Sequence, residues 1–153
     1  MVGQFWPRIC ACLESLTDEQ VWWRPNESSN SVGNLLLHLN GNLRQWILSG
    51  LGGEKDVRDR DSEFEERGPI PVSDLRARLE ATIGAVDMTL SGLTATDLLK
   101  KRSIQTSKEV SGLDAVYHVT EHFAMHYGQI LYITKMLADK DLGFYTYLTK
   151  KRA

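Results

Sequence analysis

Apolar residues recur at every third or fourth position in four stretches of the chain, and this spacing predicts helices. Between Ser31 and about Ser49 the stripe consists of Val32, Leu35, Leu36, Leu39, Leu43, Trp46 and Ile47. From near Ser111 to about Ala138 it consists of Leu113, Val116, Val119, Phe123, Ile130, Ile133, Met136 and Leu137. Residues 7–16 and 73–93 carry shorter stripes of the same kind. Amphipathic helices must bury their stripes against one another, so we expect one all-α domain over residues 1–153, a four-helix bundle.

Capping residues set the expected helix ends. Ser31 and Ser73 stand before apolar stripes as N-caps, because a serine side chain accepts a hydrogen bond from a first-turn N–H. Thr17 and Gln20 form a capping box, which predicts a brief helix after the first one. Pro7 is tolerated in a first turn. The first helix is therefore expected either to begin near Pro7 or to start upstream with a kink there.

The connections between these helices are polar. Residues 50–71, "GLGGEKDVRDRDSEFEERGPIP", are charged and glycine-rich, and we expect a long crossover loop that lets the second and third helices run parallel. Residues 92–110 are expected to hold a helical turn at 94–99 and an extended piece near 102–110. After residue 138, Phe144, Tyr145 and Tyr147 are expected to pack over one end of the bundle, and 149–153 to form a solvated basic tail.

Composition and charge exclude several classes of protein. A net charge of −2 and a pI near 6.1 argue against a nucleic-acid surface, which needs clustered positive charge. The longest apolar runs are too short for a membrane span, and "MVGQFWPRIC" has neither a basic leader nor an apolar signal core. Cys10 and Cys12 point in different directions on a helix, so we expect reduced thiols. The expected compartment is the cytoplasm.

Three of the four histidines lie in one stretch, "YHVTEHFAMHYGQI", at a strict spacing of four. Residues four apart share a helix face, so His118 and His122, or His122 and His126, could chelate one metal ion. His118 and His126 have Cα atoms roughly 12 Å apart on a helix, which is awkward for one ion. Spacing alone does not choose between the two pairs. Three polar residues on a helix face, with no metal, is the plainer alternative.

The remaining histidine, His38, lies in the second helix on a polar row with Asn34, Asn42 and Gln45. A lone helical histidine is commonly a surface or hydrogen-bonded residue. Three histidines in register on one helix, together with His38 on the polar row of another, favour a metal site. Three neutral imidazoles would leave the ion an open position for water or substrate, as catalytic sites do.

Two long segments resemble a known group of proteins. "SNSVGNLLLHLNGNLRQWI" and "HVTEHFAMHYGQILYITKML", with "WWRPN" and "RDRDSEF", are similar to members of the DinB-like superfamily of bacterial proteins, which share a four-helix bundle. The resemblance implies one divalent ion, nickel or zinc, held by His38, His122 and His126. The ligand pair of that superfamily directly precedes "GQ", here Gly128 and Gln129. The resemblance also implies a homodimer.

The resemblance implies a small-molecule substrate and two kinds of reaction. Some DinB-like proteins are similar to thiol-dependent S-transferases, which join a low-molecular-weight thiol such as bacillithiol or mycothiol to an electrophile. Others are described as metal-dependent hydrolases, in which the metal supplies hydroxide. A metal-binding stress-response module without turnover is the third hypothesis, since no general base is evident in the sequence.

Several polar residues are candidates to support the metal ligands. His118, Glu121 and Asn42 could orient an imidazole or a bound water. The charged residues of "RDRDSEF" could fold over the site, although charged loop residues are usually only solvated; these are Arg58, Arg60, Asp61 and Glu63. Core or interface packing is the expected role of Trp22, Trp23 and Trp46.

Overall fold

The chain is mostly helical in a computed structural model, which describes residues 3–105 and 108–148. The expected tail 149–153, and residues 106–107 of the expected extended piece, lie outside the described residues. The helices are α1 (Trp6–Leu13), α2 (Asp18–Trp22), α3 (Val32–Leu43), the π-helix η1 (Arg44–Ser49), α4 (Arg60–Glu65), α5 (Val72–Ser91), α6 (Ala95–Leu99), α7 (Gly112–Ala138) and the 3₁₀ turn η2 (Thr146–Leu148). The strands are β1 (Lys101–Ile104) and β2 (Lys108–Ser111).

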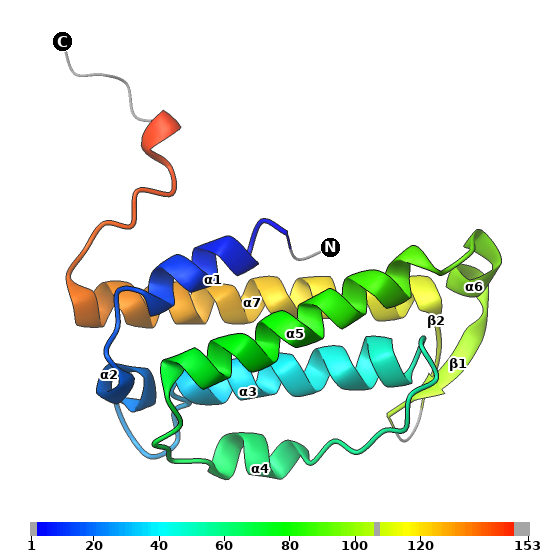
Figure 1. Cartoon of the computed structure of the whole chain (residues 1–153), viewed down its shortest axis with the longest axis horizontal. Coiled ribbons are helices and arrows are strands. Elements are labelled where there is room, and N and C mark those ends of the chain that lie inside the picture. The colour runs from blue at the N-terminus through cyan, green and yellow to red at the C-terminus, as the bar shows by residue number, and fades with distance from the viewer. Residues whose placement is uncertain (1–2, 106–107, 149–153) are drawn as a thin grey trace.

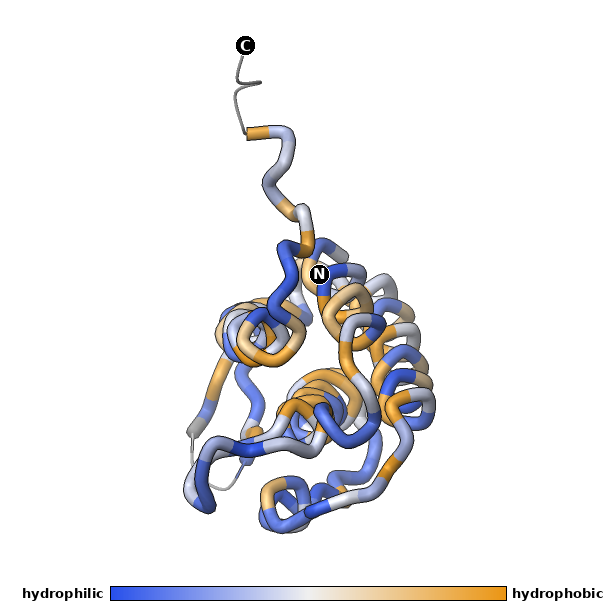
Figure 2. The backbone as a smooth tube through the Cα atoms, turned by 90° about the vertical axis from the view of Figure 1, so that its left-hand side faces the viewer, coloured by the Kyte–Doolittle hydropathy of each residue, from blue (hydrophilic) through white to orange (hydrophobic). Residues whose placement is uncertain are grey.

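The long helices pack around one core (Figure 1). Helices α3 and α5 run in the same direction, whereas α1 and α7 run in the opposite one. Contacts join α3 to both α5 and α7, and α1 to α7. Figure 2, which looks along the helix axes, shows hydrophobic and hydrophilic residues within each coil. A helix that buries one side and exposes the other requires both. The largest fully buried side chains are Phe123, Ile9, Leu35, Leu36, Leu39, Leu43, Ile47, Leu48, Leu75, Leu79 and Ile130.

Most predicted helix starts are confirmed. The Ser31 side chain accepts a hydrogen bond from the Asn34 N–H at 3.1 Å, and Thr17 and Gln20 form the expected capping box. Pro7 lies in the first turn of α1, so the alternative with an upstream helix and a kink is wrong. None of the helices in the described part of the chain combines the length and the hydropathy that a membrane span requires.

The start of α5 differs from the prediction. Ser73 does not cap this helix, because α5 begins at Val72 and Pro71 is the N-cap. The extended backbone of Pro71 leads directly into the first turn, and the Val72 N–H donates to Asp18 Oδ1 at 2.9 Å. A carboxylate from α2 therefore satisfies a first-turn donor that a local cap would otherwise meet.

The 50–71 segment is more structured than the predicted loop, because it contains α4. Asp59 is the N-cap of this helix, and its Oδ1 accepts from the Ser62 N–H at 3.3 Å. Helix α4 lies beside α3, and the segment as a whole returns along α3 before α5 begins (Figure 1). The predicted 94–99 turn is α6, and the extended piece forms an antiparallel hairpin with Lys101 opposite Ser111. This hairpin departs from an all-α chain.

The aromatic residues after α7 divide into two kinds. Phe144 packs against the core as expected, and the Arg8 guanidinium lies over the Phe144 and Tyr145 rings at 5.5 and 5.2 Å. Tyr147 is 75% exposed, so it does not share in that packing.

Candidate metal centre

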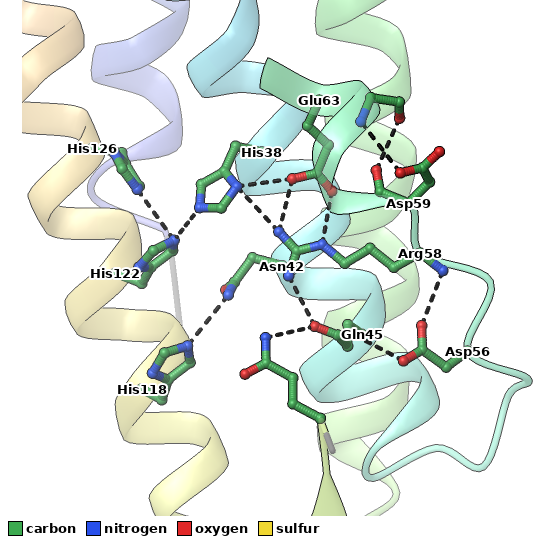
Figure 3. A network of polar contacts seen from close by, with 12 residues as sticks. His38, Asn42, Gln45, Asp56, Arg58, Asp59, Glu63, His118, His122 and His126 are labelled. Carbon is green, nitrogen blue, oxygen red and sulfur yellow. Dashed lines mark hydrogen bonds and ion pairs between the residues drawn. The ribbon is translucent and has the colours of Figure 1, made fainter. Parts of the chain in front are cut away.

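Three histidines from two helices meet between α3 and α7 (Figure 3). His38 comes from α3, and His122 and His126 come from successive turns of α7. His122 Nε2 lies 2.8 Å from His38 Nε2 and 3.1 Å from His126 Nε2. One ring nitrogen from each residue falls within 4.8 Å of the others, a spacing at which the three could hold a metal ion. His38 and His126 are buried and His122 is half-buried.

The outer nitrogen of His38 faces a buried carboxylate. His38 Nδ1 lies 2.8 Å from Glu63 Oε2, and Arg58 donates to both oxygens of Glu63, from Nε at 2.7 Å and from Nη2 at 2.8 Å. Arg58 Nη2 also lies 3.1 Å from His38 Nδ1 because both donors converge on the same oxygen. An ionised carboxylate only accepts. His38 Nδ1 therefore carries the hydrogen, and neutral His38 presents a lone pair at Nε2.

Arg58 and His38 keep Glu63 ionised. Burial alone would raise the pKa of the Glu63 carboxyl, but hydrogen bonds from Arg58 and His38 outweigh burial and hold this pKa below its ordinary value. The carboxylate is thus available as an acceptor for His38 throughout the neutral range.

His126 is oriented in the same way by a different residue. Its Nδ1 lies 2.6 Å from Gln129 Oε1, an amide oxygen that can only accept. His126 Nδ1 therefore donates to Gln129, and Nε2 presents a lone pair toward His122. Burial lowers the pKa of His126, with the Gln129 contact opposing it.

His122 lies between these two lone pairs. Burial, reinforced by the neighbouring His126 and His38, lowers the pKa of His122 to about 3, so it is neutral at physiological pH. One N–H of neutral His122 can serve only one of the two facing nitrogens. A cation that accepts all three lone pairs would satisfy the whole cluster, and the residues present therefore fit a metal ion.

Of the three expected supporting residues, Asn42 and Glu121 interact with the third, His118. Asn42 Nδ2 lies 3.3 Å from His118 Nε2, and the Trp46 ring stacks on His118 at 3.9 Å between centroids. Burial lowers the pKa of His118, while the charge of Glu121 opposes that shift. Glu121 itself is exposed. The structure thus gathers a second group one turn before the three-histidine cluster, and the two groups meet where the His118 and His122 rings stack, at 5.4 Å between centroids.

Two loop residues reach the site and two do not. Glu63 and Arg58 fold over the site, the less expected of the two alternatives for these charged residues, and lie buried beside His38 with side chains 8% and 4% exposed. Arg60 and Asp61 are exposed. The polar row of α3 carried the signal: buried polar side chains need partners, and the charged 50–71 segment supplies them.

Comparison with known proteins agrees with the fold. Residues 8–150 match the family described as "Protein of unknown function (DUF1572)". No curated protein matches the chain. A conserved protein from Enterococcus faecalis superposes with a TM-score of 0.77 at 16% identity, covering 91% of this chain and 94% of that one.

Two further solved structures are described as DinB-like proteins. The one from Bacillus cereus has a TM-score of 0.69 at 17% identity, covering 87% of this chain and 85% of its own. The one from Bacillus subtilis has a TM-score of 0.69 at 18% identity, covering 94% and 96%. At these identities the likeness concerns the fold alone. The chain belongs to the DUF1572 family, and it shares the fold of these two DinB-like proteins.

Proposed function

We propose that the chain binds one divalent metal ion, nickel or zinc, through His38, His122 and His126. The observation that carries this proposal is the convergence of three ring nitrogens within 4.8 Å of one another. Glu63 and Gln129 support it, because they turn the lone pairs of His38 and His126 inward. Imidazole ligands suit nickel and zinc better than calcium or magnesium, which prefer oxygen.

Elemental analysis of the purified protein tests the metal proposal. The wild-type chain is expected to carry about one ion, and a His122→Ala variant to lose it, because two histidines remain where three are needed. Equal metal in both proteins, with both folded by circular dichroism, would contradict the proposal.

The activity that we propose for this site is metal-dependent thiol S-transfer. Three protein ligands leave a position for an exogenous ligand, where a divalent ion lowers the pKa of a bound thiol or water and acts as a Lewis acid. In the transfer, the thiol loses its proton to solvent, its sulfur bonds to the electrophilic carbon, and the leaving group departs with its electron pair. The resemblance to DinB-like transferases supports this reaction.

A cavity beside α7 offers space for the small-molecule substrate. Its volume is about 590 Å³, within the range of small-ligand sites. The apolar part of its wall includes Trp23, Leu35, Met125, Tyr132, Ile133 and Met136. Gln129 both lines this cavity and accepts the His126 hydrogen bond. Gln129 therefore links the cavity to His126.

An assay of metal-loaded protein with candidate thiols and a chromogenic electrophile tests the activity. Product is expected only when thiol is present, at a rate above that of a His38→Ala control. Product formed without thiol would indicate the metal-dependent hydrolase. No rate above the control would leave the chain as a metal-binding module without turnover.

We also interpret α1, α3 with η1, α5 and α7 as a four-helix bundle, with residues 50–71 as the crossover between its second and third helices.

The resemblance to DinB-like proteins leads us to propose a homodimer in the cytoplasm, a compartment that fits the free, buried Cys10 and Cys12. Light scattering of the purified protein is expected to give twice the chain mass, and a monomer would contradict the dimer.

A further inference from the structure

The ion pair between Arg58 and Glu63 is unusual for a charged connecting segment, because both side chains are buried. Withdrawing two charges from water is costly, and a buried pair often stabilises a fold no better than apolar residues of similar size. An apolar pair could not, however, accept the hydrogen of His38 Nδ1. The hydrogen bond to His38 is therefore a role that an apolar pair could not take over.

The backbone around Glu63 is fastened to α3 by further polar contacts. Asn34 Nδ2 donates to the carbonyl oxygens of Glu63 and Glu66, at 2.8 and 3.0 Å. Arg24 Nη2 donates to the same Glu66 carbonyl at 2.8 Å and to Asn34 Oδ1 at 2.7 Å. These bonds hold α4 in a position from which the Glu63 carboxylate reaches His38.

Arg58 is fastened in a similar way, by a different residue of the same polar row. Its Nη1 donates to Gln45 Oε1 at 2.9 Å, while Nε and Nη2 hold Glu63. The guanidinium thus joins the start of η1 to the carboxylate beside His38, and this fixes the carboxylate in the plane that His38 needs.

Gly41 supplies the space for this ion pair. A Cβ atom at position 41 would overlap Glu63 Oε1 and would lie 2.9 Å from Arg58 Nε. Glycine is unfavourable inside a helix, so its presence in the middle of α3 is explained by the close approach of the carboxylate. Gly41 therefore leaves the space in which the Glu63 carboxylate contacts His38, three residues earlier in the same helix.

From these contacts we propose that Glu63, held by Arg58, is a positioning residue for His38 in the metal site, so that the 50–71 segment is a working part of that site. The inference rests on the proposed metal binding and deepens it. Glu63 keeps the hydrogen of His38 on Nδ1 and the ring turned toward His122, so metal binding and the docking of α4 stabilise each other.

The first test compares two glutamates of α4. Glu63→Gln keeps the shape but loses one acceptor, and its affinity for Zn²⁺, measured by chelator competition, is expected to fall about 10–100-fold. Glu65→Gln is the matched control, because Glu65 is exposed two residues away and should bind as wild type does. A purely structural role for Glu63 would lower the melting temperature and leave the affinity of the folded protein unchanged. The visible spectrum of the Co²⁺-loaded proteins should change only in Glu63→Gln.

A second pair of variants reaches the same contact from α3. Gly41→Ala should displace the carboxylate and weaken Zn²⁺ binding as Glu63→Gln does. Gly84→Ala in α5 is its control, since a Cβ there meets nothing within 4 Å. Wild-type affinity in both Glu63→Gln and Gly41→Ala would overturn the inference while leaving the metal proposal intact. A wild-type chain that binds no Zn²⁺ would overturn the metal proposal itself.

Limited trypsin digestion of the wild-type chain gives a test that needs no variant to fold. Arg60 and Arg67 are exposed cleavage positions within the 50–71 segment. Zn²⁺ is expected to slow cleavage at both by several-fold, because a fixed His38 holds Glu63 and with it α4. Equal cleavage with and without Zn²⁺, in a chain that binds the ion, would overturn the proposed coupling.

Discussion

His118 and His126 are equivalent in the sequence but not in the structure. Each lies four residues from His122 on the same helix, yet only His126 turns its Nε2 toward His122, at 3.1 Å. The His126 ring is nearly perpendicular to the His122 ring, at 85°. The His118 ring is almost parallel to it, at 18°, so the lone pairs of those two rings lie in separate planes and do not converge.

Neighbouring side chains cause this difference. Gln129 accepts from His126 Nδ1 and leaves Nε2 free to face the cluster. At the other end, Trp46 covers the His118 ring and Asn42 occupies its Nε2. Equal spacing on a helix therefore gives both histidines the same access to His122, and the residues that orient each ring decide which one turns a nitrogen toward it.

The largest expected effect separates the two histidines directly. His126→Ala should lower Zn²⁺ affinity more than about 100-fold, beyond the range expected for changes to supporting residues, because one of three ligands is lost. His118→Ala should retain about one ion per chain. Metal content after dialysis measures both. If His118→Ala lost the ion and His126→Ala kept it, the assignment of the pair would be reversed.

A smaller effect is expected from the residues that orient the two rings. Gln129→Ala frees His126 Nδ1 from its acceptor and should weaken Zn²⁺ binding about tenfold. Asn42→Ala removes a contact of His118 alone, so its affinity should match that of wild type. Chelator competition on both variants measures the difference. A larger loss in Asn42→Ala would place His118 among the ligands after all.

The sequence predicted the parts of this molecule that depend on local patterns. Helical stripes and N-caps placed the start of α3 and both ends of α7 within a residue or two, because a capping signal lies within one turn of the helix end that it defines. The predicted second helix, to about Ser49, continues past the end of α3 at Leu43 only as the π-helix η1. Ser73 failed as a cap because the competing acceptor, Asp18, comes from 54 residues away. Local preference gives way where a tertiary contact already satisfies the same backbone donor.

The candidate site, too, was predictable only where its residues carry a local pattern or a family resemblance. Helix periodicity brought His122 and His126 together, and the resemblance to DinB-like proteins singled out that pair and added His38. For Glu63 and Arg58 the sequence left two alternatives, folding over the site or solvation, and favoured solvation, because nothing local marks a carboxylate whose buried partner lies 25 residues away in the sequence. The polar row of α3, and Gly41 in the same helix, are local traces of that contact.

The pH dependence of stability gives a third, weaker test in the metal-free protein. The pKa of His122 falls from 6.5 to about 3 on folding, and those of His118 and His126 are also lowered. The unfolded chain therefore binds more protons below about pH 6.5, and the free energy of unfolding should fall as the pH drops. Protonation of Glu63 lowers the free energy of unfolding only below the ordinary pKa of this group, 4.5. The loss of stability between pH 6.5 and 4.5 therefore comes from the histidines.

Urea denaturation from about pH 7 to about pH 5 measures this slope. His122→Gln should flatten it more than His118→Gln, because His122 has the larger shift. The same slope in His122→Gln as in wild type would mean that His122 is not held neutral by the cluster.

The smallest effect is expected at Glu121, which tests whether the group around His118 is separate from the metal site. Its charge raises the pKa of His118 against the effect of burial, so Glu121→Gln should lower that pKa further in an NMR titration of the metal-free protein. Zn²⁺ affinity should change by no more than a factor of about two, since Glu121 is exposed and its interactions are screened. A shifted His118 resonance with unchanged affinity would show that the two groups act independently. A large loss of affinity would instead join Glu121 and His118 to the metal site, and the contrast between His118 and His126 would then be one of degree.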